Sequence, residues 1–312
     1  MERLIIDTDP GVDDAQAILL ATAHPNAKVE ALLAVGGNVG LDHTVRNALT
    51  IVEVTGQDIP VYAGCAYPLV MFGEDASHFH GHDGLGDIGL VPKVRQAESE
   101  HASLALLRMA NDAPGEYTLV AIGPLTNIAV ALKLDPELPN KLKRLVVMGG
   151  AVTARGNTRN VSAEFNIYHD PEAAHVVFAG WEQQGKMIEL VDWEATVRHA
   201  IPKGVLQQWM ALNTPKSRFY QAISAKTLQF TAQLAGQRVM FAADPLAMAV
   251  ALEPDIVTKA ESRHVAVELT GMYTRGQTTV DWRGRNGRTP NTNIILEVDT
   301  DRFFALMEQG LR

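Results

Sequence analysis

Short apolar segments alternate with helical segments along most of the chain, and this alternation limits its fold more than any other feature. The apolar segments lie at residues 4–6, 29–35, 117–122, 145–148 and 187–191. They are separated by helical patterns at residues 12–23, 43–54, 125–134 and 171–178. Strands that are buried on both faces and separated by helices are typical of a mostly parallel sheet with helices on both sides. The sequence therefore predicts an α/β fold built on an open, mostly parallel sheet.

The last part of the chain departs from this regular alternation. Residues 202–252 have mostly helical patterns, and residues 265–269 and 278–282 are predicted to form an antiparallel pair of strands. A further strand is predicted at residues 292–298, before a closing helix. No repeat, low-complexity stretch or linker divides the sequence, so we expect residues 1–312 to form a single domain.

The composition excludes several classes of partner. Lys and Arg number 27 against 36 Asp and Glu, a net charge of −9, whereas nucleic-acid-binding proteins usually carry a basic surface. No apolar run reaches the roughly 18 residues that a membrane span needs. The single Cys65 cannot form an internal disulfide, and the acidic cluster at Asp7 comes too early for a signal peptide. We therefore expect a cytoplasmic protein with a small-molecule ligand and no nucleic-acid or membrane partner.

Polar and glycine-rich segments follow four of the predicted strands. They are residues 7–14, 36–38, 123–127 and 148–166. In open parallel sheets ligands bind beyond the carboxyl ends of the strands. The four segments are therefore predicted to line one shared cleft.

The first of these segments places four carboxylates within eight residues, at Asp7, Asp9, Asp13 and Asp14. Carboxylates stabilise the first turn of a helix, but capping needs one or two of them rather than four. Mutual repulsion among four is relieved by a hard divalent cation such as Ca²⁺ or Mg²⁺, which prefers oxygen ligands. A further acid, Asp244, precedes a proline at a predicted helix start, where it could cap the helix, ligate a metal, or do both.

An ordered series of short motifs accompanies the segment Asp7–Ala15. The motifs are Gly37-Asn38, His80-Gly81, Gly123-Pro124-Leu125-Thr126-Asn127, Met148-Gly149-Gly150, Ala163-Glu164-Phe165-Asn166-Ile167 and Asp170-Pro171-Glu172-Ala173-Ala174. Together they resemble the signature of the inosine-uridine-preferring nucleoside hydrolases. The resemblance runs from Leu4 to about Leu252, and more loosely to the end of the chain.

This resemblance implies a nucleoside hydrolase-like open sheet and the hydrolysis of ribonucleoside N-glycosidic bonds with one bound Ca²⁺. It implies a homodimer or homotetramer. The implied metal ligands are Asp9, Asp14, the carbonyl of Ile122 and Asp244. Asp9 is implied as the base that activates a Ca²⁺-bound water, with Asp13 and Asn38 close to the reaction. A carboxylate base suits this ion, because Ca²⁺ lowers the pKa of a bound water less than Zn²⁺ does.

The resemblance also implies the residues that bind the substrate. They are Asp13, Asn38, His80, Met148, Asn157, Glu164 and Asn166. Glu164 and Asn166 lie two residues apart, so in an extended segment they would point to the same side. For the asparagine that precedes this motif the sequence offers Asn157 and Asn160, of which we prefer Asn157.

One position departs from the family pattern. The family usually has a histidine immediately before the late aspartate, as proton donor to the leaving base, and purine-specific relatives have a tryptophan there. This chain has Ala243. Candidate substitutes are His80, His82, Tyr220, Arg238 and Trp282. Alternatively the substrate is one whose leaving group needs no acid, such as a nicotinamide riboside. We expect His78 and His82 to be solvated loop residues or to support the site from outside.

Two other functions remain open at this point. A haloacid-dehalogenase-like phosphohydrolase also begins with a strand that ends in Asp-x-Asp, but it needs Thr or Val where this chain has Gly11. A ribonucleoside-binding protein with little turnover would explain Ala243.

Overall fold

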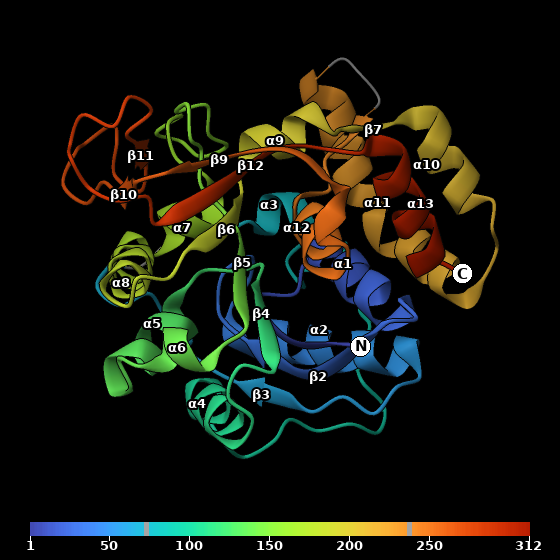
Figure 1. Ribbon diagram of the computed structural model, residues 1–312. Helices are drawn as coiled ribbons and strands as arrows, with labels where there is room; N and C mark the ends of the chain where they lie inside the picture. Colours follow the sequence, from blue (N-terminus) through green and yellow to red (C-terminus); the bar gives the residue numbers. More distant parts are fainter. Residues whose placement is uncertain (72–74, 236–238) are drawn as a thin grey trace.

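A computed structural model of the protein describes residues 1–71, 75–235 and 239–312. Its centre is an eight-stranded sheet with the strand order β3-β2-β1-β4-β5-β6-β12-β9 (Figure 1). These strands are β1 (Glu2–Thr8), β2 (Ala27–Ala34), β3 (Val61–Ala63), β4 (Tyr117–Ala121), β5 (Arg144–Met148), β6 (Ile188–Val191), β9 (Val257–Arg263) and β12 (Thr292–Val298). Only β9, at the edge, runs antiparallel to its neighbour, which confirms the mostly parallel sheet.

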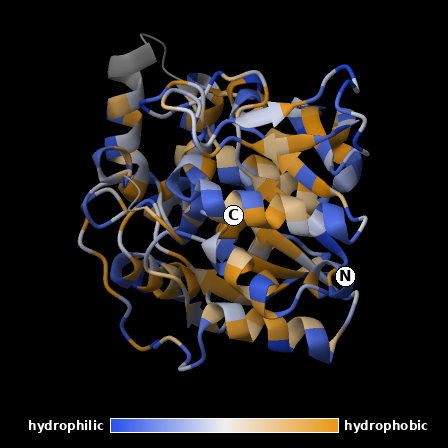
Figure 2. Ribbon diagram, turned by 90° about the vertical axis from the view of Figure 1, so that its left-hand side faces the viewer, coloured by the Kyte–Doolittle hydropathy of each residue, from blue (hydrophilic) through white to orange (hydrophobic). Residues whose placement is uncertain are grey.

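Helices cover both faces of this sheet, because both faces of its strands are apolar. In β1, Leu4 and Ile6 pack with α1, α12 and α13, whereas Ile5 packs with α4, α5 and α8 on the other face. The strands are mostly orange in the hydropathy view of Figure 2. The larger helices are α1 (Val12–Ala23), α2 (Leu41–Thr55), α4 (Ala102–Asp112), α5 (Thr126–Leu134), α8 (Pro171–Gln183), α10 (Lys203–Met210), α11 (Pro215–Ala235), α12 (Ala243–Leu252) and α13 (Thr300–Gly310).

Shorter elements complete the fold. The short helices are α3 (Ser77–His80), α6 (Leu138–Lys141), α7 (Phe165–His169), α9 (Trp193–Arg198) and the 3₁₀ helix η1 (Pro254–Ile256). Two small antiparallel sheets pair β7 (Ile201–Pro202) with β8 (Val239–Met240), and β10 (Val265–Val267) with β11 (Thr278–Val280). The second of these confirms the antiparallel pair predicted near the end of the chain. None of the helices in the described ranges combines the length and the apolar character that a membrane crossing requires.

The sheet brings the predicted polar segments to one edge. Asp7 of β1 is level with Leu33 of β2 and Ala121 of β4, so the residues that follow these parallel strands leave the sheet together. Asn127, at the start of α5, links three of these ends. Its side chain donates to Asp7 Oδ2 (2.9 Å) and to the carbonyl of Ala34 (3.2 Å), and it accepts from the N–H of Cys65 (2.7 Å). The predicted shared cleft therefore lies at the carboxyl edge of β2, β1, β4 and β5.

Candidate functional site

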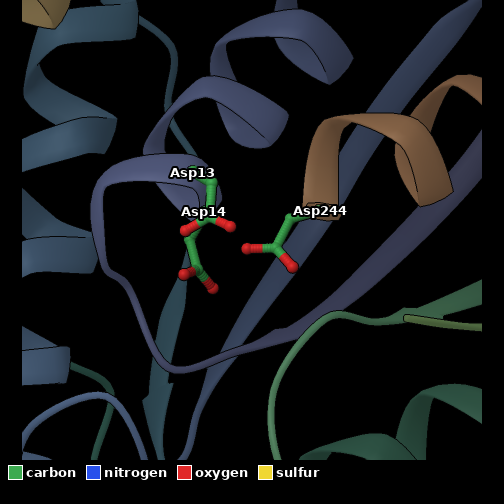
Figure 3. Close-up of side chains that lie close together, drawn as sticks. All are labelled: Asp13, Asp14 and Asp244. Atoms are coloured by element: carbon green, nitrogen blue, oxygen red, sulfur yellow. The ribbon is translucent and has the colours of Figure 1, made fainter. Parts of the chain in front are cut away.

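Carboxylates from two distant parts of the sequence meet at this edge. Asp13 and Asp14 come from the first turn of α1 and Asp244 from the first turn of α12, and their side chains point toward one another (Figure 3). One oxygen from each of the three lies within 4.8 Å of the others. Asp9, on the turn between β1 and α1, is close enough to raise the pKa of Asp244 by its charge.

Neighbouring backbone groups fix two of these carboxylates. Asp14 accepts from the N–H of Gly11 at 2.9 Å and from Thr8 Oγ1 at 2.5 Å, so it satisfies the start of α1. Asp9 Oδ2 accepts from the N–H of Asn38 at 2.6 Å, and Asn38 Nδ2 donates to the carbonyl of Asp9 and to Asp14 Oδ2, each at 3.2 Å. Of the four clustered acids, only Asp14 helps to cap α1. Helix capping therefore does not explain why the other three carboxylates are placed here.

The cap predicted as an option for Asp244 is not formed. The helix α12 begins at Ala243, two residues earlier than a cap at Asp244 would require, and no side chain caps it. Asp244 is nevertheless buried, at 3% exposed. Its carboxylate faces Asp13 and Asp14 instead of the helix N-terminus.

The carboxylate cluster has no cation to balance it among the described residues. Burial, followed by the charges of neighbouring carboxylates, raises the pKa of Asp9, Asp14 and Asp244. The nearest basic side chain, His80, lies 3.9 Å from Asp13 Oδ1, and burial lowers its pKa to about 4. Asp9 Oδ1 is buried without a hydrogen-bond partner in the described part of the chain. An uncompensated cluster of buried oxygen ligands fits a hard divalent cation.

Glu164 and Asn166 lie beside this cluster, but not in the extended segment that we expected. Glu164 is instead the N-cap of α7, where its carboxylate accepts from the N–H groups of Gly150, Asn166 and Ile167 at 2.9, 2.9 and 3.3 Å. The prediction of an extended segment was wrong because Glu164 caps the N–H groups that follow it, and the chain forms the helix α7 from Phe165 onward. Both side chains still line the pocket. Asn166 Nδ2 donates to the carbonyls of Ile122 and Met148, each at 3.2 Å.

The two candidate asparagines before this motif have different surroundings. Asn157 lines the pocket, and its side-chain oxygen accepts from the N–H of Phe165 at 2.9 Å. Asn160 is used within its own loop and donates to the carbonyl of Arg275 at 2.6 Å. The geometry therefore favours Asn157 as the residue that faces a ligand.

A cavity of about 250 Å³ is lined by Asp13 and Asp244 of the carboxylate cluster. We define its inner part as the half-buried Asp13 together with the buried lining residues Asn38, Ile122, Met148, Glu164, Asn166 and Asp244. We define its outer part as the aromatic rings of the lining that are half-buried or exposed, namely His78, Phe79, Phe165, Trp193, Phe230 and Phe241. Trp193 and Phe241 are in ring contact at 5.4 Å, as are Phe79 and Phe230 at 5.6 Å. The cavity thus combines a polar, acidic floor with aromatic walls.

Sequence comparison decides which class of enzyme this site belongs to. A model of the family described as inosine-uridine preferring nucleoside hydrolase matches residues 4–305. The chain belongs to this family. It is an N-glycosidase, a hydrolase of the N-glycosidic bond of ribonucleosides, and the phosphohydrolase and non-catalytic alternatives are not favoured.

Individual nucleoside hydrolases resemble the chain over almost its whole length. The non-specific ribonucleoside hydrolase RihC of Salmonella newport (strain SL254) is 37% identical over 301 residues, which are 96% of this chain and 94% of RihC. The inosine-uridine preferring nucleoside hydrolase of Crithidia fasciculata is 34% identical over 317 residues, which are 99% of this chain and 97% of that enzyme.

Solved nucleoside hydrolase structures confirm the fold. An inosine-guanosine nucleoside hydrolase superposes with a TM-score of 0.91 at 34% identity, over 100% of this chain and 99% of that one. The plant nucleoside hydrolase PpNRh1 gives the same TM-score of 0.91 at 31% identity, over 99% of this chain and 98% of that one.

The departure from the nucleoside hydrolase pattern lies on the pocket wall. Ala243 is 6% exposed and lines the cavity next to Asp244. Of the predicted substitutes for its missing side chain, only His80 lines the cavity within the described residues. Tyr220 is buried and donates to Met240 Sδ (3.0 Å), while His82 and Trp282 are exposed and do not line it. Arg238 lies outside the described residues.

The aromatic part of the wall was missed in the sequence. Trp193 follows β6, Phe230 lies on α11 and Phe241 precedes α12, so no motif groups them. His78 was expected to be a loop residue without direct contact to a ligand, but it lines the cavity. The only sequence signal near this wall is that residues 191–196, which include Trp193, differ from the commoner Leu-Asp-x-Thr of the family.

Proposed function

We propose that this nucleoside hydrolase acts with one Ca²⁺ held by Asp9, Asp14, Asp244 and the carbonyl of Ile122, and that Asp9 is the base. The observation that carries this proposal is the convergence of carboxylates at a cavity, with no balancing cation among the residues that the structure describes. Oxygen ligands alone favour Ca²⁺ or Mg²⁺ over zinc. When bound, such an ion lowers the pKa of a coordinated water and can ligate vicinal hydroxyls of a ribose.

The inner part of the cavity is proposed to hold the ribose. Asp13, Asn38, Glu164 and Asn166 offer carboxylate and amide groups to its hydroxyls, with Asn157 at the rim. Met148 and His80 complete this wall. The transition state of glycosidic cleavage is an oxocarbenium-like sugar, which the buried negative charges of the floor stabilise. Asp9 accepts the proton of the attacking water through Oδ1, the oxygen without a partner in the described residues.

The outer part of the cavity is proposed to hold the base. Its aromatic rings offer stacking surfaces to a purine or a pyrimidine. Relatives carry names that point both ways, as a non-specific ribonucleoside hydrolase and as an inosine-guanosine hydrolase. The stacking surfaces here support acceptance of both base types.

A reducing-sugar assay tests this proposal. Ribonucleosides and their 2′-deoxy counterparts are incubated with the enzyme, with and without a chelator. We expect ribose release from ribonucleosides, its loss in chelator and its return with Ca²⁺, and poor cleavage of deoxyribonucleosides. Asp9→Asn should abolish turnover, while Asp112→Asn, at an exposed carboxylate on α4, should not. Equal rates on uridine and 2′-deoxyuridine, or full activity in chelator, would contradict the proposal.

We further propose a single domain over residues 1–312 that assembles as a homodimer or homotetramer in the cytoplasm. The single cysteine supports a reducing compartment, and the continuous match to family members supports one unit. Light scattering on the purified protein measures the oligomeric state, and a monomer would contradict this part of the proposal.

A further inference from the structure

We propose that His78 donates the proton to the leaving base. His78 lies on α3 and lines the outer, aromatic part of the cavity, which is the part assigned to the base. Its ring contacts Phe230 edge-on at 5.7 Å. The carbonyl of Phe79, the next residue, accepts a hydrogen bond from Thr227 Oγ1 at 3.1 Å. This hydrogen bond joins α3 to α11 next to His78. The inference rests on the proposed placement of ribose on the acidic floor.

His80, the other imidazole on the cavity wall, is already committed to a different role. Its Nδ1 accepts a hydrogen bond from the N–H of Val12 at 3.2 Å. A protonated ring would present an N–H to this backbone N–H, so His80 is held as the neutral Nε2–H tautomer. His80 can therefore donate a hydrogen bond, but it does not carry the proton that a general acid transfers.

The remaining groups on the wall do not supply a suitable acid either. Thr231 donates its hydroxyl to the carbonyl of Thr227 at 2.9 Å, and a hydroxyl is a weak acid. Ala243 has no polar group, and the carboxylates lie on the floor rather than in the aromatic part. Among the lining residues that the structure describes, His78 alone combines an ionisable side chain with a place in the aromatic part.

The surroundings of His78 suit a group that loses and regains a proton. Its side chain is exposed, and its ring nitrogens have no hydrogen bond within the described ranges, so both are available to a ligand and to solvent. The charged and titratable groups on neighbouring elements are Asp75, His80, His82 and, on α11, Lys226. Asp75 accepts hydrogen bonds from Ser77, and Lys226 is paired with Asp87. Histidine changes its charge between pH 5 and 8, the range in which a general acid is most effective.

The step balances as follows. The bond between C1′ and the base nitrogen breaks, and its electron pair stays on the base. The proton of the His78 imidazolium passes to a ring nitrogen of the base, which leaves as a neutral molecule. The oxygen of water forms the new bond to C1′, and its proton passes to Asp9. His78 then takes a proton from solvent and Asp9 releases one, so the net reaction consumes one water.

The test compares leaving groups that differ in their need for a proton. Inosine and p-nitrophenyl riboside are measured with the wild type, His78→Gln, and the matched control His82→Gln. p-Nitrophenolate leaves without protonation, whereas general acid catalysis is worth roughly 10²–10⁴-fold for a poor leaving group. We expect His78→Gln to lower kcat on inosine about 100-fold or more and to change kcat on p-nitrophenyl riboside less than about threefold.

Every other outcome counts against the inference. If His78→Gln lowers both rates equally or neither rate, or if His82→Gln reproduces its effect, His78 is not the donor. p-Nitrophenyl riboside separates this failure from that of the proposed function, because its cleavage depends on the ribose side alone. If the wild type cleaves neither substrate, the proposed function fails and the inference falls with it. Because His78 is exposed, the variant should unfold at the wild-type temperature, which excludes misfolding as the cause.

Discussion

At the scale of single residues, hydrogen bonds decide what each carboxylate in the site is free to do. Asp14 has both oxygens engaged by Thr8, Gly11 and Asn38. Asp9 has one oxygen fixed by the N–H of Asn38 and the other without a partner in the described residues. The two aspartates therefore have different roles. The carboxylate of Asp14 is held in place through both oxygens, whereas Asp9 has one oxygen available to accept a proton.

Glu164 caps α7 and is also proposed to bind the ribose. A variant of Asp170, which caps the next helix, can distinguish the two roles. Asp170 caps α8 as Glu164 caps α7, accepting from the N–H of Ala173 at 3.0 Å, but it does not line the cavity. Both Glu164→Gln and Asp170→Asn should cost about 1–2 kcal/mol in the free energy of unfolding. Only Glu164→Gln should lower kcat/KM on uridine, by about 100-fold, because only Glu164 faces the ribose. Similar kcat/KM values in the two variants would show that Glu164 has only the structural task.

Asp192, at the start of α9, makes the stability of the protein depend on pH. Burial, then the nearby Glu194, raises its pKa to about 7. Between about pH 4 and pH 7 the unfolded chain loses this proton while the folded protein retains it, so the ionisation of Asp192 lowers stability as pH rises. Asn cannot ionise. Urea unfolding should therefore show the stability of Asp192→Asn increasing relative to wild type across this window, whereas Asp112→Asn shows a constant difference. A constant difference for Asp192→Asn as well would refute the assignment.

At the scale of elements, the sequence predicted the strands and the place where they end, but not the walls between them. Parallel strands with polar ends converge by geometry, so the segments that contain Asp13, Asn38 and Asn166 could be grouped in advance. The carbonyl of Ile122 was expected there only from the family resemblance. The short helix α7 could not, because the N–H donors that Glu164 caps are revealed only by the fold. The aromatic wall depends on how α3, α9 and α11 pack, and contacts between distant helices leave no periodic signal in the sequence.

Glycines at the strand ends create the space for Asp9. A Cβ on Gly37, which follows β2, would lie 2.1 Å from Asp9 Oδ2, whereas a Cβ on Gly40 would meet nothing within 4 Å. Gly37→Ala should displace the Asp9 carboxylate and lower kcat by about 100-fold or more, since catalytic groups need placement within about 0.5 Å. Gly40→Ala should leave kcat unchanged. Circular dichroism checks that both variants are folded, and unchanged activity in a folded Gly37→Ala would show that the site tolerates this shift.

At the scale of the whole molecule, the site exists only when the sheet is assembled. The acidic floor contains Asp9, which lies between β1 and α1, and Asp14, which lies in α1. It also contains Asp244 from α12, more than 200 residues later in the sequence. The three carboxylates meet because α12 packs against α1. The carboxylates repel one another in the folded state and are far apart in the unfolded chain. The electrostatic cost of the site is thus a cost of folding the whole molecule, and a bound cation would offset it.

The binding of Ca²⁺ should therefore raise the stability of the entire protein. A ligand that binds only the folded state adds about 2.7 kcal/mol at 100 times its Kd. With an unfolding entropy of about 2.1 cal/mol/K per residue, this gain shifts the Tm of a 312-residue chain by roughly 4 °C. We expect differential scanning fluorimetry to show this rise when Ca²⁺ is added to chelator-treated protein. In Asp244→Asn the rise should be lost and the metal-free Tm should be higher than in the wild type, because one repelling charge is gone. If Ca²⁺ raises the Tm of Asp244→Asn as much as that of the wild type, then Asp244 is not a ligand, and the ion binds elsewhere.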